Sequence, residues 1–124
     1  MTNIKSFKDL RTWQESHLLT LEIYRLSKSW PREESYGLTS QIRRAAASIP
    51  SNIAEGMGRG STKDLIRFLI NARGSIQEVI YQLLLAKDLG YISPDDFDKT
   101  QNRYSGLNAG NNSHMAELSR QNPE

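Results

Sequence analysis

The chain has 124 residues, enough for one ordinary domain and too few for two independent hydrophobic cores. It has no cysteine, which excludes disulfide bonds, thiolate nucleophiles and cysteine-ligated metals. Its formal net charge of +2 is too small to indicate nucleic-acid binding by itself. Because neither a hydrophobic leader nor an apolar run of about 18 residues is present, we expect a cytoplasmic protein without a membrane span.

The N-terminal segment predicts a long first helix. Ser6 can cap it, because Asp9 follows three positions later, near the positive end of the helix dipole. We expect this helix to run to about Ser29, since Pro31 breaks it or opens the next element.

A second helix is expected to begin within residues 31–41 and to end near residues 56–60, where three of five residues are glycines. Its apolar positions form one continuous stripe, made of Leu38, Ile42, Ala45, Ala46, Ile49 and Ile53. Pro50 lacks an amide donor, so it predicts either a kink or a helix that stops at Ile49 and restarts.

The third helix is expected to run from Ser61, its cap, to Gly90, a candidate for the left-handed residue that ends a helix. Its apolar stripe is the strongest in the chain and predicts core; it contains Leu65, Phe68, Leu69, Ala72, Ile76, Val79, Ile80 and Leu83. Gly74 indicates close packing of this helix onto the second.

A fourth helix is expected to start with Ser93 as its cap and Pro94 in the first helical position. Glycine and asparagine are frequent in its second half, so we expect it to fray or break between Gly106 and Ser113, with a weakly ordered tail over residues 106–124. Since connections are short and no strand-like alternation occurs, the chain is predicted to be one all-α domain over residues 1–124, an antiparallel up-down four-helix bundle.

Two apolar stripes lie on opposite sides of the first helix. One predicts the bundle core, and it contains Leu10, Trp13, His17, Leu21 and Tyr24. The other contains Leu19, Ile23, Leu26 and, if the helix reached it, Trp30. A bundle buries only one such stripe, so we expect the second to contact another subunit; the alternative is that loops or the tail cover it. His17 is expected to be a packing residue, and His114 has no partner at metal-ligand spacing, so no metal site is predicted.

The second helix also has a polar stripe, formed by Gln41, Arg44, Ser48, Asn52, Glu55 and Arg59. It is either a solvated face, a buried polar seam, or the lining of a central opening in an assembly. On the second and third interpretations, the expected subunit interface combines both helices and contains Leu19, Ile23, Leu26, Trp30, Gln41, Arg44, Ser48, Asn52 and Glu55.

Basic side chains are concentrated in the middle of the chain, where residues 37–73 hold six basic and two acidic side chains. The candidate nucleic-acid contacts are these six: Arg43, Arg44, Arg59, Lys63, Arg67 and Arg73. We do not expect aromatic side chains to interleave with the basic ones on this patch, and no helix resembles a base-recognition helix, so sequence-specific binding is not expected. The loop GMGRGS could bind an anion at the start of the third helix or be a plain interhelical turn.

Several stretches resemble a known family, namely FKDLRTWQ, YGLTSQIRRAAASIPSNIAEGMGR, FLINARGSIQEV and LGYI. They are similar to the four-helix-bundle proteins encoded in intervening sequences of bacterial 23S ribosomal RNA genes, often labelled S23 ribosomal protein. The likeness runs from Phe7 to Ile92 and is weaker beyond. It implies a left-handed up-down bundle that assembles into a ring-like homopentamer. It also implies kinship with the accessory variability determinant of diversity-generating retroelements, which engages nucleic acid and a reverse transcriptase.

Three classes of function are compatible with these features. The first is a non-enzymatic homo-oligomer that binds RNA or DNA through a basic surface, where a ring would multiply weak contacts. The second is a scaffold or adaptor that recruits a protein partner. The third, an enzyme, is not expected, because the paired carboxylates at Glu33/Glu34 and Asp95/Asp96 lie at helix starts, where the dipole favours acids. No cofactor is expected.

Overall fold

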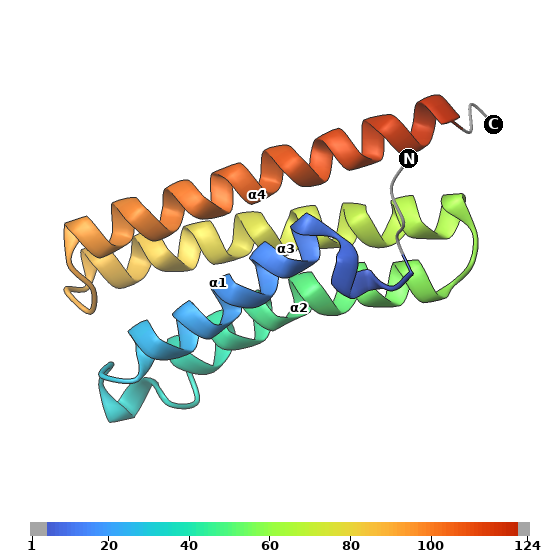
Figure 1. The fold of residues 1–124 in the computed structure, drawn as a ribbon. Helices are drawn as coiled ribbons and strands as arrows, with labels where there is room; N and C mark the ends of the chain where they lie inside the picture. Colours follow the sequence, from blue (N-terminus) through green and yellow to red (C-terminus); the bar gives the residue numbers. More distant parts are fainter. Residues whose placement is uncertain (1–4, 122–124) are drawn as a thin grey trace.

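The computed structural model describes residues 5–121. Within that range the chain forms four α-helices and two short 3-10 helices (Figure 1). The α-helices are α1 (Arg11–Ser27), α2 (Leu38–Gly58), α3 (Thr62–Asp88) and α4 (Pro94–Gln121). The 3-10 helices are η1 (Phe7–Asp9), before α1, and η2 (Arg32–Glu34), between α1 and α2. The all-α four-helix fold predicted from the sequence is confirmed.

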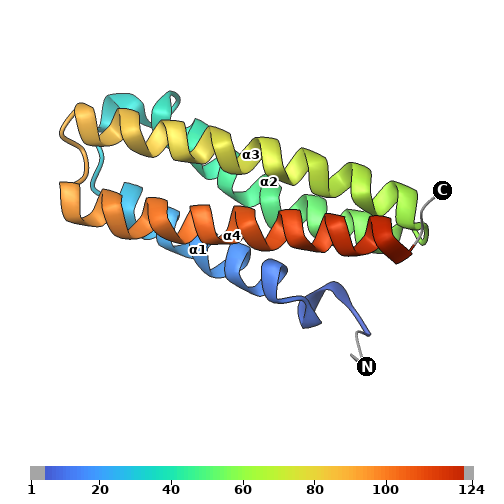
Figure 2. The same ribbon diagram turned by 90° about the horizontal axis from the view of Figure 1, so that it is seen from above.

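Consecutive helices run in opposite directions, as Figures 1 and 2 show. α1 packs on α2 and α4, and α3 packs on the same two helices, while α1 and α3 do not contact each other. These two helices therefore lie on one diagonal of the bundle, and α2 and α4 lie on the other. The core between them is continuous from Leu10 to Met115.

Capping explains where most helices begin and end. The Ser61 hydroxyl accepts the Asp64 amide at 3.1 Å, and the Ser93 hydroxyl accepts the Asp96 amide at 3.1 Å, as the sequence predicts. Gly90 follows α3 with φ +81°, which favours glycine and ends the helix there. The capping box of Ser6 and Asp9 is present, but it closes only η1.

From His17 onward the core face of α1 is the opposite of the predicted one, whereas Leu10 is buried in the core and Trp13 packs against it, as predicted. Leu19 and Ile23 are fully buried, and Leu26 and Trp30 are nearly so, which makes them core residues and not a subunit interface. Leu21 and Tyr24 are instead 54% and 46% exposed. The prediction was wrong because both stripes are apolar, so periodicity could not rank them.

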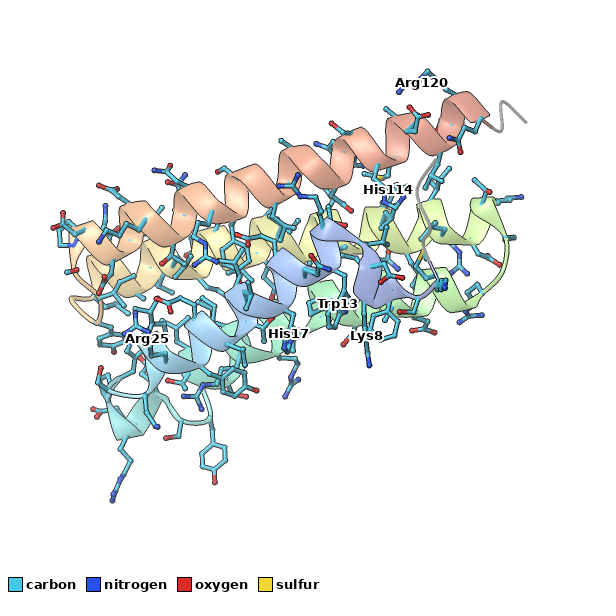
Figure 3. All side chains as sticks on the ribbon, in the orientation of Figure 1. Lys8, Trp13, His17, Arg25, His114 and Arg120 are labelled. Carbon is cyan, nitrogen blue, oxygen red and sulfur yellow. The ribbon has the colours of Figure 1, made fainter. Side chains whose placement is uncertain are left out.

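The first helix also begins later than predicted, because the backbone is extended at Leu10 and α1 begins only at Arg11. His17, predicted in the core, is exposed, with its ring stacked on Trp13 at 5.1 Å between centroids (Figure 3).

Pro50 does not interrupt α2, which is one helix from Leu38 to Gly58. Because Pro50 has no amide hydrogen, the Ala46 carbonyl has no donor within its own helix. The Thr20 hydroxyl of α1 lies 3.2 Å from that carbonyl and 2.8 Å from its own helix's Ser16 carbonyl. A side chain from the neighbouring helix therefore partly replaces the missing backbone bond.

The close approach of α2 and α3 occurs at Gly56 and not at Gly74. A Cβ at Gly56 would lie 2.8 Å from Phe68 Cβ and 3.0 Å from a Leu65 methyl. A Cβ at Gly74 would meet nothing within 4 Å, so the expected packing role of that glycine is wrong.

α4 is continuous to Gln121, whereas the sequence predicted a break between Gly106 and Ser113. Its buried side chains include Tyr104, Leu107, Asn111 and Met115, which extend through the predicted break. The Asn111 amide also donates to the Leu69 carbonyl of α3 at 2.8 Å. Packing of this face outweighs the low helix propensity of the glycines. Of the predicted weak tail, residues 122–124 lie outside the described residues.

Candidate nucleic-acid interface

Two of the six predicted phosphate-binding cations are paired with carboxylates. Arg59 lies 2.8 Å from Glu55, and Arg67 lies 3.2 Å from Asp64. The bond from Arg67, with one from Ser61, lowers the pKa of Asp64 below its ordinary value, which keeps that carboxylate ionised. Both arginines are therefore largely neutralised locally, although their guanidinium groups remain on the surface.

Arg43 is folded against α1. Its Nε donates to the Ser27 hydroxyl at 2.8 Å, and its guanidinium lies 4.6 Å from the centre of the Tyr24 ring. Since these contacts are to neutral groups, Arg43 orders the seam between α1 and α2 and keeps its positive charge.

The remaining three cations are exposed, and none has an ion pair within residues 5–121. They are Arg44 on α2 and Lys63 and Arg73 on α3. Lys63 and Arg73 are ten residues apart on one helix, a separation of about 15 Å along its axis. Of the six predicted nucleic-acid contacts, these three are thus exposed and unpaired within the described residues, and they lie apart from each other on α2 and α3.

The polar stripe of α2 divides into two parts. The Ser48 hydroxyl lies 2.6 Å from the Ser75 hydroxyl of α3, and the Asn52 amide donates to the Ser48 carbonyl at 2.7 Å. These two residues are half-buried between helices of the same chain. Gln41, Arg44 and Glu55 are exposed, so that part of the stripe is open to another molecule.

Two open grooves border Arg44 along the first half of α2. One has a volume of about 490 Å³ and is lined by Tyr36, Ser40, Gln41, Arg44, Ala45, Ser48 and Glu78. The other has a volume of about 340 Å³ and is lined by Tyr24, Ser35, Thr39, Ser40, Arg43 and Arg44. Both volumes fall within the range of ordinary ligand-binding sites.

The sequence analysis missed the two tyrosines of these grooves. Tyr24 was placed in the core because it lies on the apolar stripe of α1 that was assigned to the core, and Tyr36 lies in the loop before α2. Their distances in sequence from Arg44 hide the fact that all three line adjacent grooves.

The GMGRGS loop has the features of a plain interhelical turn. Gly60 has φ +84°, and a shallow hollow of about 190 Å³ beside it is lined by Gly56, Met57, Gly60, Ser61, Thr62 and Leu65. Neither Arg59 nor Lys63 is among the lining residues of this hollow, although Lys63 lies exposed in the first turn of α3.

The described part of the chain holds neither a group of side chains suited to a metal ion nor a helix suited to crossing a membrane. Within residues 5–121, no group of three or more His, Cys, Asp or Glu side chains is close enough to hold a metal ion. His114 is half-buried on α4, and burial lowers its pKa. None of the helices in this range has the length and apolar character needed to span a bilayer.

Comparison with known proteins identifies the family. A family model described as 23S rRNA-intervening sequence protein matches residues 8–113. The chain belongs to this family. The match continues past Ile92 into α4, where the resemblance noted in the sequence had weakened.

A solved member of the same group has the same fold. It is the crystal structure of a protein of unknown function from the S23 ribosomal protein family of Bacteroides thetaiotaomicron. The TM-score is 0.75 at 23% sequence identity, over 84% of this chain and 97% of that one. No curated protein matches this chain. Membership of the 23S rRNA-intervening sequence family thus accounts for the fold of this chain and does not specify a function.

Proposed function

We propose that this protein is a non-enzymatic homo-oligomer that binds nucleic acid through phosphate contacts, without sequence specificity. The observation that carries the proposal is the set of exposed cations on α2 and α3 that have no ion pair within residues 5–121, namely Arg44, Lys63 and Arg73. Phosphate contacts from such side chains are individually weak, so a single chain would bind poorly. A ring of copies would present the same cations repeatedly and raise the avidity.

Exposed apolar side chains support self-association. On the outer side of α1, Leu18 and Leu21 are 52% and 54% exposed. A second stripe on the outer side of α3 contains Ile70, Tyr81 and Leu84, which are 45%, 60% and 39% exposed.

The arrangement of the two stripes favours a ring. They belong to helices on one diagonal of the bundle, so they face opposite ways. An interface between two different patches is head-to-tail, and repeating it closes a ring when the rotation permits. The family resemblance implies five copies. In such a ring Arg44 on α2 would not be covered by the subunit contacts, because α2 lies on the other diagonal. Lys63 and Arg73 lie on the same side of α3 as Ile70 and border that contact, so the mass in solution of a variant at these two residues is measured together with its RNA affinity.

Charge-reversal variants test the nucleic-acid contacts. Lys63→Glu with Arg73→Glu should weaken binding to a 20-nucleotide RNA by at least tenfold at low salt, because each phosphate contact contributes to the salt-dependent affinity. The slope of log affinity against log salt should fall by about two. The measurement is fluorescence anisotropy over a salt series.

A matched control separates local contacts from net charge. Arg11→Glu with Lys99→Glu changes the net charge equally, but these exposed residues lie on α1 and α4 and not on α2 or α3. The control should bind nearly as well as the unaltered protein. Equal losses in both variants would show a nonspecific charge effect, and an assembled protein that ignores RNA altogether would point to a protein partner instead.

A further inference from the structure

Tyr36 is the most exposed large hydrophobic side chain in the described chain, at 99%. It lies in the turn between η2 and α2 and contributes to no core contact. Its ring is therefore available to stack on another molecule. It stands at the edge of the larger groove, which Arg44 also lines.

A second tyrosine lies on the other side of Arg44. Tyr24 of α1 is 46% exposed and lines the smaller groove. The Arg43 guanidinium lies over its ring at 4.6 Å, and the bond from Arg43 to Ser27 holds that guanidinium in place. Arg43 thereby orients Tyr24, whose ring is still half-exposed.

The two grooves differ in charge. The larger one contains a carboxylate, Glu78, together with the polar side chains of Gln41 and Ser48. The smaller one has two arginines and four residues with a hydroxyl group, and none of its lining residues within positions 5–121 is acidic. A phosphate is therefore favoured in the smaller groove and repelled by Glu78 in the larger one. The larger groove instead offers a free aromatic ring with donors and acceptors for a base edge.

We propose that the two grooves beside Arg44 bind a single-stranded nucleic acid, with phosphate in the smaller groove and a base stacked on Tyr36 in the larger. This inference rests on the proposed function and specifies the form of nucleic acid that it takes. Bases of a duplex are stacked on each other and have no open face, so only an unpaired strand can use an aromatic platform. Arg44 serves both grooves and joins the phosphate contact to the base contact.

The test compares one strand with a duplex. Fluorescein-labelled oligouridylate of twelve nucleotides and a twelve-base-pair RNA duplex are titrated by anisotropy with the full chain. Tyr36→Ala should weaken binding of the single strand about tenfold, the scale of one lost stacking contact. Duplex binding should be unchanged. Tyr36→Phe keeps the ring and should bind like the unaltered protein. Because Tyr36 is fully exposed, neither change should alter the fold or the mass in solution.

Photo-crosslinking gives a second and independent readout. A strand containing 5-bromouridine should form its main adduct at Tyr36, located by mass spectrometry of the digested complex. An adduct elsewhere, together with an unaffected Tyr36→Ala variant, would overturn the inference. If strand and duplex bind equally and Tyr36→Ala changes neither, the proposed function stands while the single-strand site does not. If the unaltered protein binds neither RNA, the proposed function itself fails.

Discussion

At the scale of single residues, a hydroxyl on one helix compensates for a proline in another. The Thr20 hydroxyl is buried against the Ala46 carbonyl, the group that Pro50 leaves without its backbone donor. An unpaired buried carbonyl is costly, so this contact lets a proline persist in the middle of α2.

Thr20→Val should therefore destabilise the bundle by about 1–3 kcal/mol, because it keeps the side-chain shape and leaves the Ala46 carbonyl unpaired. In a Pro50→Ala background the new amide supplies the missing bond, so the same change should cost about 1 kcal/mol less. Urea unfolding of the four proteins of this cycle measures the coupling. An equal cost in both backgrounds would contradict this account of Pro50.

Two of the glycines within helices differ in whether a side chain at that position would have room. Gly56 lies where α2 and α3 touch, with a neighbouring Cβ atom 2.8 Å from the position of its own added Cβ. Gly74 faces open space on the surface of α3.

Gly56→Ala should lower the free energy of unfolding by about 1–3 kcal/mol, because the two helices must move apart. Gly74→Ala should raise it by about 0.5–1 kcal/mol, since alanine is the better helix former. Thermal unfolding of both variants, followed by circular dichroism, compares the signs. Stabilisation by Gly56→Ala would show that the helix contact yields more readily than its geometry indicates.

At the scale of elements, one carboxylate links the start of α2 to the end of α3. Glu34 accepts the Leu38 amide at 3.0 Å and the Tyr91 hydroxyl at 2.7 Å. These two bonds lower the pKa of Glu34 below its ordinary value. The same carboxylate raises the pKa of Tyr91 above its ordinary value.

The pH dependence follows from the two directions. The depressed pKa of Glu34 contributes stability above the unfolded value of about 4.3, which is lost as pH falls through the lower folded value. The raised pKa of Tyr91 contributes stability below about 10, which is lost as pH rises through the higher folded value.

Glu34→Gln should consequently lower the Tm most between about pH 5 and pH 9, and the difference from the unaltered protein should shrink toward pH 3. Glu33→Gln is the control, since the neighbouring Glu33 is exposed and makes neither bond. A Tm difference that does not change with pH would show that the Glu34 bonds do not depend on its charge.

At the scale of the whole molecule, exposed apolar side chains lie on the outer sides of α1 and α3, which are diagonally opposite in the bundle. The surface of α2 is polar and partly basic. Leu18 and Leu21 on α1 do not contact the stripe of Ile70 and Leu84 within the same chain, because α1 and α3 are not neighbours. Association between copies is the arrangement that covers both stripes at once.

Leu18→Ser with Leu21→Ser should reduce the mass in solution toward the 14.1 kDa of one chain, since it removes apolar area from one side of every contact. Ile70→Ser with Leu84→Ser should have the same effect from the other side. Light scattering at several concentrations measures both. Unchanged assembly in both variants would place the interface on a different surface, and a monomeric unaltered protein would remove the ring.

The sequence predicted where the helices begin and end better than it predicted which side of each helix is buried. The caps Ser61 and Ser93 and the glycine stop at Gly90 depend on residues a few positions apart, so local patterns sufficed to place the helices. The core face of α1 could not be predicted in this way, because its two apolar stripes are equally regular in the sequence. Only contact with α2 and α4 selects Leu19 over Leu21.

At the candidate site, too, the residue types could be predicted from the sequence, while their contacts could not. The sequence by itself determined the family, the four helices and which side chains are basic, because each depends on residue types at short spacing. Only the tertiary structure decided that Arg59 and Arg67 are paired, that Arg43 lies on Tyr24, and that Arg44 is free between two tyrosine-lined grooves. The physical reason is that pairing, burial and the meeting of distant side chains depend on how the helices pack against each other.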